Sequence, residues 1–323
     1  MPGDSGNRGV NRINPDLWKA DILRSVDMYN KWFMDFAPVA YRAARIKATK
    51  DVTATLDKTR NLTDVSAELL RREPNVLPTL RMSTCPPIAV DRLVGLAGVS
   101  KTLVSSMEEG RIPLRIMPEA LESQLKCIGT ILERLADPDI FTWLGRRMAA
   151  TQSEIQRAAT IVADRLCGAV ANPTIRNAQE KRQLAAIEAW LQKRGYRRVP
   201  PKVKFDAMPS GTYANRLNVP VKRPDQKRLN IPVDAVVMPK SAKPGELPLL
   251  IEAKSAGDYT NVNKRRKEEA TKMNQLRDTY GKNMRFILFL CGYFDTGYLG
   301  YEAAEGIDWV WEHRIEELAK FGL

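Results

Sequence analysis

The apolar residues of the first half of the chain recur every three or four positions, which is the period of an amphipathic helix. In the segment 16–49 these residues are Leu17, Ile22, Val26, Met28, Trp32, Phe33 and Phe36. Pro38 is expected to interrupt this helix, because proline lacks an amide hydrogen and clashes with the preceding turn. Similar patterns at 65–72 and 120–135 predict further helices, and no strand pattern stands out between Pro15 and Gly168.

After residue 172 the pattern changes to apolar, β-rich runs separated by polar segments. Gly168, Asn172 and Pro173 predict a joint between domains, followed by a helix that Gly195 ends. Strands are expected at 203–207, 231–238, 247–254, 284–292 and 307–311, with helices at 263–281 and 313–321. The sequence therefore predicts an α+β protein, with an all-helical domain at 1–172 and, at 173–323, an α/β core with a central mixed sheet flanked by helices.

The composition limits the chemistry that this chain can perform. No apolar run approaches the roughly 18 residues that a membrane span needs, and the first 16 residues resemble a frayed tail rather than a signal peptide, so we expect a cytoplasmic protein without membrane contact. The four cysteines are widely spaced and His313 is the single histidine, which argues against zinc and against a Ser-His-Asp triad. Carboxylates, lysine and a hard metal ion remain as the groups that could perform the chemistry.

The charge favours a polyanionic partner. The chain holds 51 Lys and Arg against 38 Asp and Glu, for a net charge of +13. Between Lys193 and Arg228 there are eleven basic and two acidic residues, and proline and glycine keep much of this stretch in loops. Because neutralising phosphates releases counterions, we expect nucleic acid as the partner, with contacts from Arg223, Lys227 and Arg228.

Three ionisable residues lie inside β-rich apolar runs, at Asp234 in PVDAVV and at Glu252 and Lys254 in LLIEAKS. Burying such groups is costly unless they are paired or bind a metal. Residues i and i+2 of a strand share a face, so Glu252 and Lys254 point together, and Asp234 joins them if the preceding strand pairs with theirs. Two carboxylates suit Mg²⁺, while the lysine would orient or help deprotonate the attacking water. The alternative is an ordinary ion pair on a half-exposed strand, with Asp234 in an unrelated turn.

Longer motifs carry a family resemblance. NAQEKRQLAAIEAWL, IPVDAVV, LLIEAKSAGDYTNVNKRRKEEA and GYFDTGYLGYEAAEGIDWVWEHRIEEL resemble the nuclease domain of the XamI-like type II restriction endonucleases, of the PD-(D/E)xK class, and NPDLWKADILRSVDMYNKWFMDFAP extends the resemblance to the N-terminus. One departure is that Val233, not proline, directly precedes Asp234. The resemblance implies cleavage of double-stranded DNA at a short palindromic site with Mg²⁺, for which Mn²⁺ could substitute. A palindromic site in turn implies a homodimer.

In related nucleases an acidic residue on the first helix of the domain often completes the metal site. Here Glu180 and Glu188 compete for that role, since both flank the apolar stripe of the helix, and Glu180 is slightly preferred. Either glutamate could instead be an ordinary solvated residue.

Two further segments are candidates for DNA contact. The first follows Lys254 and contains residues suited to bases and phosphates, namely Thr260, Asn261, Asn263, Lys264, Arg265 and Arg266. The second, at about 88–112, resembles a helix-turn-helix with its turn at 98–100, Ser100 as the helix cap, and Lys101, Thr102 and Ser105 on the outer side. A solvated helix face and an ordinary helix hairpin are the respective alternatives.

Two other functions are compatible with these features. A structure-specific or repair nuclease would share the same three catalytic residues. A helix-turn-helix DNA-binding regulator with an inactive nuclease fold would use the second segment, although the intact set of Asp234, Glu252 and Lys254 speaks against it.

Overall fold

The computed structural model describes residues 9–146, 148–200, 203–222, 228–259, 262–281 and 283–323. The chain forms two compact units, one comprising 1–36 with 176–323 and the other 37–175. The expected joint at residue 172 falls inside a helix, α7 (Gln152–Lys193), which continues through Pro173. Likewise α1 (Pro15–Lys58) continues through Pro38, so the predicted interruption is wrong. A proline removes one backbone hydrogen bond, and here that loss does not end the helix.

The described residues of the 37–175 unit form helices joined by turns and loops, and their β pairing is limited to an isolated bridge between Thr84 and Ala136. Besides its parts of α1 and α7, this unit contains α2 (Ala67–Arg72), η1 (Pro74–Val76), α3 (Leu77–Met82), α4 (Val90–Ala97), α5 (Lys101–Glu108) and α6 (Pro118–Leu135). Its core gathers buried residues such as Val52, Leu70, Leu103, Leu125 and Ile128 from these helices. The N-terminal region is therefore helical, as the periodicity predicts, although the compact helical unit spans 37–175 rather than 1–172.

The other unit is built on a mixed sheet of six strands in the order β1-β2-β3-β4-β5-β6. The strands are β1 (Arg197–Arg198), β2 (Thr212–Lys222), β3 (Arg228–Met238), β4 (Leu249–Ala256), β5 (Phe286–Gly292) and β6 (Asp308–Trp311). Strands β2, β3 and β4 are antiparallel neighbours, and β4, β5 and β6 are parallel. The α+β fold with a central mixed sheet is confirmed.

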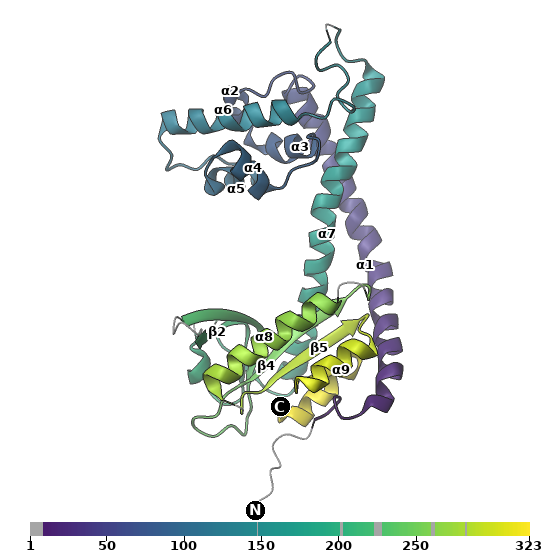
Figure 1. Cartoon of the computed structure of the whole chain (residues 1–323), viewed down its shortest axis with the longest axis vertical. Coiled ribbons are helices and arrows are strands. Elements are labelled where there is room, and N and C mark those ends of the chain that lie inside the picture. Colours follow the sequence, from purple (N-terminus) through teal and green to yellow (C-terminus); the bar gives the residue numbers. More distant parts are fainter. Residues whose placement is uncertain (1–8, 147, 201–202, 223–227, 260–261, 282) are drawn as a thin grey trace, which may run out of the picture. The chain divides into compact units, whose positions relative to one another are not determined.

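Helices cover both faces of this sheet (Figure 1). On one face α8 (Val262–Tyr280) and α9 (Thr296–Ala304) pack through Met273, Leu276 and Leu299. On the other face, α7 and η3 (Glu312–Phe321) pack through residues such as Ile187 and Leu318. Gly195 follows the end of α7 with a φ of 76°, as its expected role in ending the helix requires.

Two local predictions are wrong. Residues 203–207 were expected to form a strand, but the structure has a short 3₁₀ helix there, η2 (Phe205–Ala207). Residues 212–222 were expected in a loop but form β2, which pairs with β3 along nearly its whole length. Only the two residues of β1 pair on the other side of β2, so most of its length is an edge, where Pro220 needs no amide hydrogen.

The N-terminal segment belongs to the sheet unit and is not frayed from residue 10 onward. The carboxylate of Asp308 accepts hydrogen bonds from the backbone of Val10, Asn11 and Arg12. The buried Asn11 side chain donates to Trp309 O and to Glu317 Oε2, both at 2.8 Å. The buried Asp308 needs these donors, which explains why the segment is tied down.

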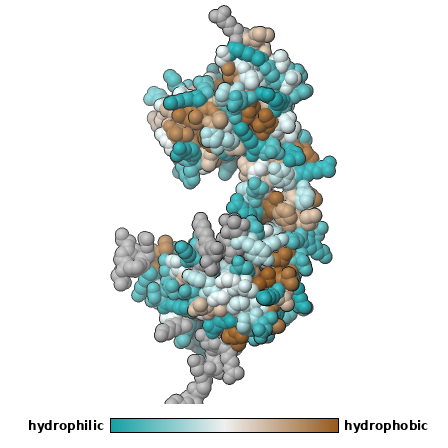
Figure 2. Space-filling view, turned by 45° about the vertical axis from the view of Figure 1, so that its right-hand side comes forward, coloured by the Kyte–Doolittle hydropathy of each residue, from teal (hydrophilic) through white to brown (hydrophobic). Residues whose placement is uncertain are grey.

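The surface also carries exposed apolar side chains, and Figure 2 shows them as patches set among polar residues. The most exposed described examples include Leu23 and Met34 of α1, and Leu114 and Met117 before α6. Scattered exposure of this kind is ordinary for a folded protein and assigns no function by itself. Within the described residues no helix combines the length and apolarity needed to cross a membrane.

Candidate active site at the end of the β3–β4 ladder

Asp234 and Glu252 meet where β3 and β4 stop pairing. The two strands are paired at Val237↔Leu249, Val236↔Leu250 and Ala235↔Ile251. Continuing that register by one position places Asp234 opposite Glu252. Asp234 Oδ2 accepts a hydrogen bond of 2.9 Å from the backbone amide of Ala253, so its carboxylate spans the gap between the strands.

Lys254 lies on the same face of β4 as Glu252, as the alternation of the strand requires. Its Nζ is 3.2 Å from Glu252 Oε1. Burial alone would lower the pKa of the Lys254 ammonium, but the carboxylates of Glu252 and Glu269 raise it above its ordinary value. The structure therefore brings Asp234, Glu252 and Lys254 together, with the lysine held in its charged form.

Helix α8 adds two side chains that the sequence pattern placed differently or did not single out. Glu269, which follows a segment whose alternative interpretation was a solvated helix face, is only 1% exposed, and its Oε1 lies 3.3 Å from Lys254 Nζ. Lys272 Nζ lies 2.7 Å from Glu252 Oε2 and donates to Pro232 O at 2.9 Å. The signal that could have revealed them is their spacing of four positions from the inward-facing residues, Glu269 from Met273 and Lys272 from Leu276.

Burial and neighbouring negative charge both disfavour the ionised form of Asp234. The pKa of Asp234 is raised to about 6, first by burial and then by the negative charge of Glu252, with a smaller contribution from Glu180. The hydrogen bond from Ala253 acts in the opposite direction. A carboxyl with a raised pKa beside a second acid gains from any added positive charge.

Glu180 and Glu188 lie in different surroundings on α7. Glu180 is close enough to Asp234 to influence its pKa. Glu188 instead accepts hydrogen bonds from Tyr213 Oη at 2.8 Å and from Asn215 Nδ2 at 3.2 Å. These contacts direct Glu188 toward β2, and the influence of Glu180 on Asp234 favours Glu180 as the third acid.

Arg216 is an unexpected neighbour of the site. In the β2–β3 ladder Asn215 pairs with Ala235 and Leu217 with Val233, so Arg216 falls opposite Asp234. Its φ of 53° lies in the left-handed region, which is strained for a residue other than glycine. Its guanidinium donates to Glu180 Oε1 at 2.5 Å. No sequence signal marked Arg216, because the segment was expected to be a loop.

Two short helices joined by a tight turn occupy the segment that was expected to form a helix-turn-helix. Gly98, with a φ of 63°, ends α4, and the Ser100 side chain caps α5 by accepting from Leu103 N. Lys101 and Thr102 are exposed and Ser105 is half-buried, while Leu103 packs into the core. Lys101 Nζ is 2.9 Å from Asp91 Oδ1. The helix-turn-helix, and DNA contact through it, stay predictions.

The structure describes only some of the other residues that were predicted to contact DNA. Thr260, Asn261, Arg223 and Lys227 lie outside the described residues. The backbone of Asn263, Lys264, Arg265 and Arg266 belongs to the first turns of α8, and Arg228 begins β3, but their side chains are outside the description. Candidates in the α8 group therefore lie at the start of the helix that carries Glu269 and Lys272.

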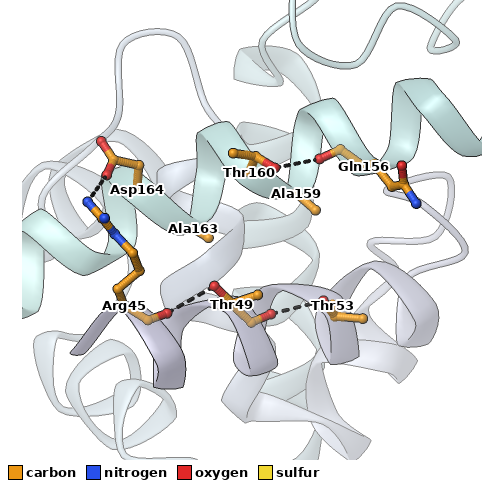
Figure 3. Close-up of a pocket in the computed structure, with 8 residues that line it drawn as sticks. All are labelled: Arg45, Thr49, Thr53, Gln156, Ala159, Thr160, Ala163 and Asp164. Atoms are coloured by element: carbon orange, nitrogen blue, oxygen red, sulfur yellow. Dashed lines mark hydrogen bonds and ion pairs between the residues drawn. The ribbon is translucent and has the colours of Figure 1, made fainter. Parts of the chain in front are cut away.

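A separate pocket lies in the helical unit between α1 and α7 (Figure 3). Arg45 pairs with Asp164 at 3.2 Å at one end of it. The hydroxyls of Thr49, Thr53 and Thr160 donate to carbonyls four residues earlier in their own helices. These hydroxyls are thus committed to the backbone, and the pocket contains none of the residues expected to perform catalysis.

Comparison with known proteins identifies the family of the chain. A family model described as XamI restriction endonuclease matches residues 60–311. The chain belongs to the XamI restriction endonuclease family. Over 315 residues it is 50% identical to the type II restriction enzyme SalI of Streptomyces albus G, which covers 97% of this chain and 99% of that protein. No solved structure matches it significantly.

Membership of the XamI restriction endonuclease family confirms the family resemblance and the prediction of a type II restriction endonuclease, an enzyme that hydrolyses double-stranded DNA. It also decides against the DNA-binding regulator and the repair nuclease. The matched region contains Asp234, Glu252, Lys254 and the α4–α5 segment. The roles of these residues are not settled by the match.

Proposed function

We propose that this member of the XamI restriction endonuclease family cleaves both strands of DNA at a short palindromic site, in a Mg²⁺-dependent reaction at Asp234, Glu252 and Lys254. The observation that carries the proposal is the convergence of these three side chains at the open end of the β3–β4 ladder. A PD-(D/E)xK nuclease is defined by that set, and the family supplies the type of reaction.

The residues present fit a hard divalent cation. Asp234 and Glu252 offer oxygen ligands on facing strands, and the raised pKa of Asp234 reflects its burial and the negative charge of Glu252, both of which a bound cation would offset. Among the described residues no group of three His, Cys, Asp or Glu side chains is placed to hold a metal ion. Water and DNA phosphate oxygens would therefore complete the coordination, as is usual for Mg²⁺, and Glu180 would join after a side-chain movement.

When bound, Mg²⁺ would supply Lewis-acid activation of the phosphate and lower the pKa of a bound water. Asp234 and Glu252 would hold the cation. Lys254 would donate from its ammonium toward the attacking water or a non-bridging phosphate oxygen, stabilising the negative charge that develops in the transition state. The burial of the surrounding strands limits bulk water around these groups, which strengthens the electrostatic interactions.

Recognition of DNA would use the segments proposed from the sequence. The polar residues between Thr260 and Arg266 would read bases next to the cleaved bond, and Arg223, Lys227 and Arg228 would contact phosphates. Lys101, Thr102 and Ser105 of α5 would form a second contact through the helix-turn-helix. Because each chain carries one site and a palindrome has two-fold symmetry, we propose that a homodimer cuts the two strands.

Digestion of a sequenced plasmid tests this function. The wild-type enzyme is expected to give discrete bands in Mg²⁺ and no cleavage in EDTA. Asp234→Ala and Glu252→Ala should abolish cleavage yet still shift the mobility of the same DNA, since each loses a metal ligand and a negative charge near phosphate. Lys243→Gln, a change of an exposed loop lysine, serves as the control. Full cleavage by either carboxylate variant would refute the site.

A further inference from the structure

Glu269 is a buried acid in direct contact with the candidate catalytic lysine. Its carboxylate is 1% exposed, and its Oε1 lies 3.3 Å from Lys254 Nζ. The same ammonium lies 3.2 Å from Glu252 Oε1. Lys254 therefore sits between two carboxylates, one from its own strand and one from the helix that covers the sheet.

The position of Glu269 on α8 makes this contact rigid. Ala270, Met273 and Leu276 of the same helix are buried against the sheet unit, so the helix cannot rotate without losing that packing. A buried carboxylate is costly unless it is paired, which favours the geometry in which Glu269 faces a cation. Glu252, by contrast, is also bound by Lys272 at 2.7 Å.

The lysine side chain needs such a partner. Its four-carbon stem is flexible, and holding its ammonium in one place costs rotamer entropy. If Glu252 takes up a divalent cation, its attraction for the ammonium weakens, because the carboxylate charge is then shared. Glu269 is not a ligand in the proposed metal site, so its contact with the Lys254 ammonium does not depend on metal binding.

We propose that Glu269 is a positioning residue that holds the Lys254 ammonium in place during cleavage. It acts through Lys254 and does not touch the DNA or the metal. The inference rests on the proposed function of Lys254. The adjacent Glu268 is exposed, and the chain thus provides a matched control one residue away.

The test uses the full-length enzyme and a plasmid with one mapped cleavage site. Four variants are compared with the wild type: Glu269→Gln, Glu268→Gln, Lys254→Met and the double variant Lys254→Met/Glu269→Gln. For each, the single-turnover cleavage rate, the dissociation constant for a duplex spanning the site, and the melting temperature in EDTA are measured.

We expect Glu269→Gln to slow cleavage at least about tenfold while changing the DNA dissociation constant less than about twofold. Glu268→Gln should cut at the wild-type rate. The double variant should be no slower than Lys254→Met, because Glu269 acts only through the lysine. It should also melt above Lys254→Met, since the single variant removes a cation that lies beside a buried carboxylate.

The outcomes separate this inference from the proposed function. Normal cutting by Lys254→Met would remove the proposed role of the lysine. Loss of cutting in Lys254→Met together with normal cutting in Glu269→Gln would overturn only the role of Glu269. A double variant much slower than Lys254→Met would show that Glu269 acts independently of the lysine, which would also overturn the inference.

Discussion

Asp234 lies opposite Glu252 across β3 and β4, one position beyond the last paired residues of the two strands. The proximity of these two acids, together with burial, raises the pKa of Asp234 to about 6. The pairing of β3 with β4 does not extend to this position. The Asp234 carboxylate instead accepts a hydrogen bond from the backbone amide of Ala253. The site thus lies where β3 and β4 stop pairing, and it brings the carboxylates of Asp234 and Glu252 close together.

The first prediction follows from the raised pKa of Asp234. Well below the unfolded pKa of 3.8 the group is protonated in both states and costs nothing, whereas the destabilisation grows between that value and the folded pKa of about 6 and is complete above it. In EDTA, Asp234→Asn should therefore raise the free energy of unfolding by about 1–3 kcal/mol at pH 7.5 and have little effect at pH 4. Urea unfolding at both pH values checks this. An equal effect at the two values would contradict it.

The second prediction concerns Lys254. Lys254→Ala should still bind DNA and metal, because the lysine is not a metal ligand in the proposed site. The single-turnover rate should fall far more than the DNA dissociation constant rises. If Lys254 were only half of an ion pair with Glu252, cutting would remain near normal, with a stability loss of at most about 1 kcal/mol. Measuring rate and thermal stability on one variant distinguishes the two cases.

The third prediction separates Glu180 from Glu188. If Glu180 joins the metal site, Glu180→Gln should raise the Mg²⁺ concentration needed for half-maximal cleavage by about tenfold or more. Glu188→Gln is the matched control on the same helix. It should leave the Mg²⁺ requirement unchanged and lower only stability, through the loss of its charged bonds to Tyr213 and Asn215. A metal titration that places the larger shift on Glu188 would reverse the assignment.

The fourth prediction tests the polar segment that follows Lys254 in the sequence. Asn261→Ala or Arg265→Ala should weaken binding to the cognate duplex by about 1–3 kcal/mol if the side chain reads a base. Binding to unrelated duplexes should then change little, whereas a phosphate contact would weaken both alike. Fluorescence anisotropy with one cognate and one unrelated duplex measures the difference. Unchanged affinity for both would leave this segment without a role in binding.

Part of this architecture could be predicted from local patterns. The strand containing Asp234 and the strand containing Glu252 and Lys254 follow from apolar β-rich runs, and helical segments follow from an apolar period near 3.6. The continuity of α1 through Pro38 and of α7 through Pro173 does not follow from these patterns. The family motifs added the class of enzyme, which the comparisons confirm. The sequence pattern did not predict the edge strand at residues 212–222. This strand contains Pro220 and a strained backbone at Arg216, neither of which is typical of a strand.

The sequence by itself determined the alternation that places Glu252 and Lys254 on one face of a strand, since residues i and i+2 of any strand share a face. Only the tertiary structure decided what meets them there. The register of β3 against β4 brings Asp234 opposite Glu252, and the packing of α8 buries Glu269 and Lys272 beside Lys254 and Glu252. These contacts join residues that no local pattern couples, because the rotation of a helix and the register of a strand are set by the packing of the whole core.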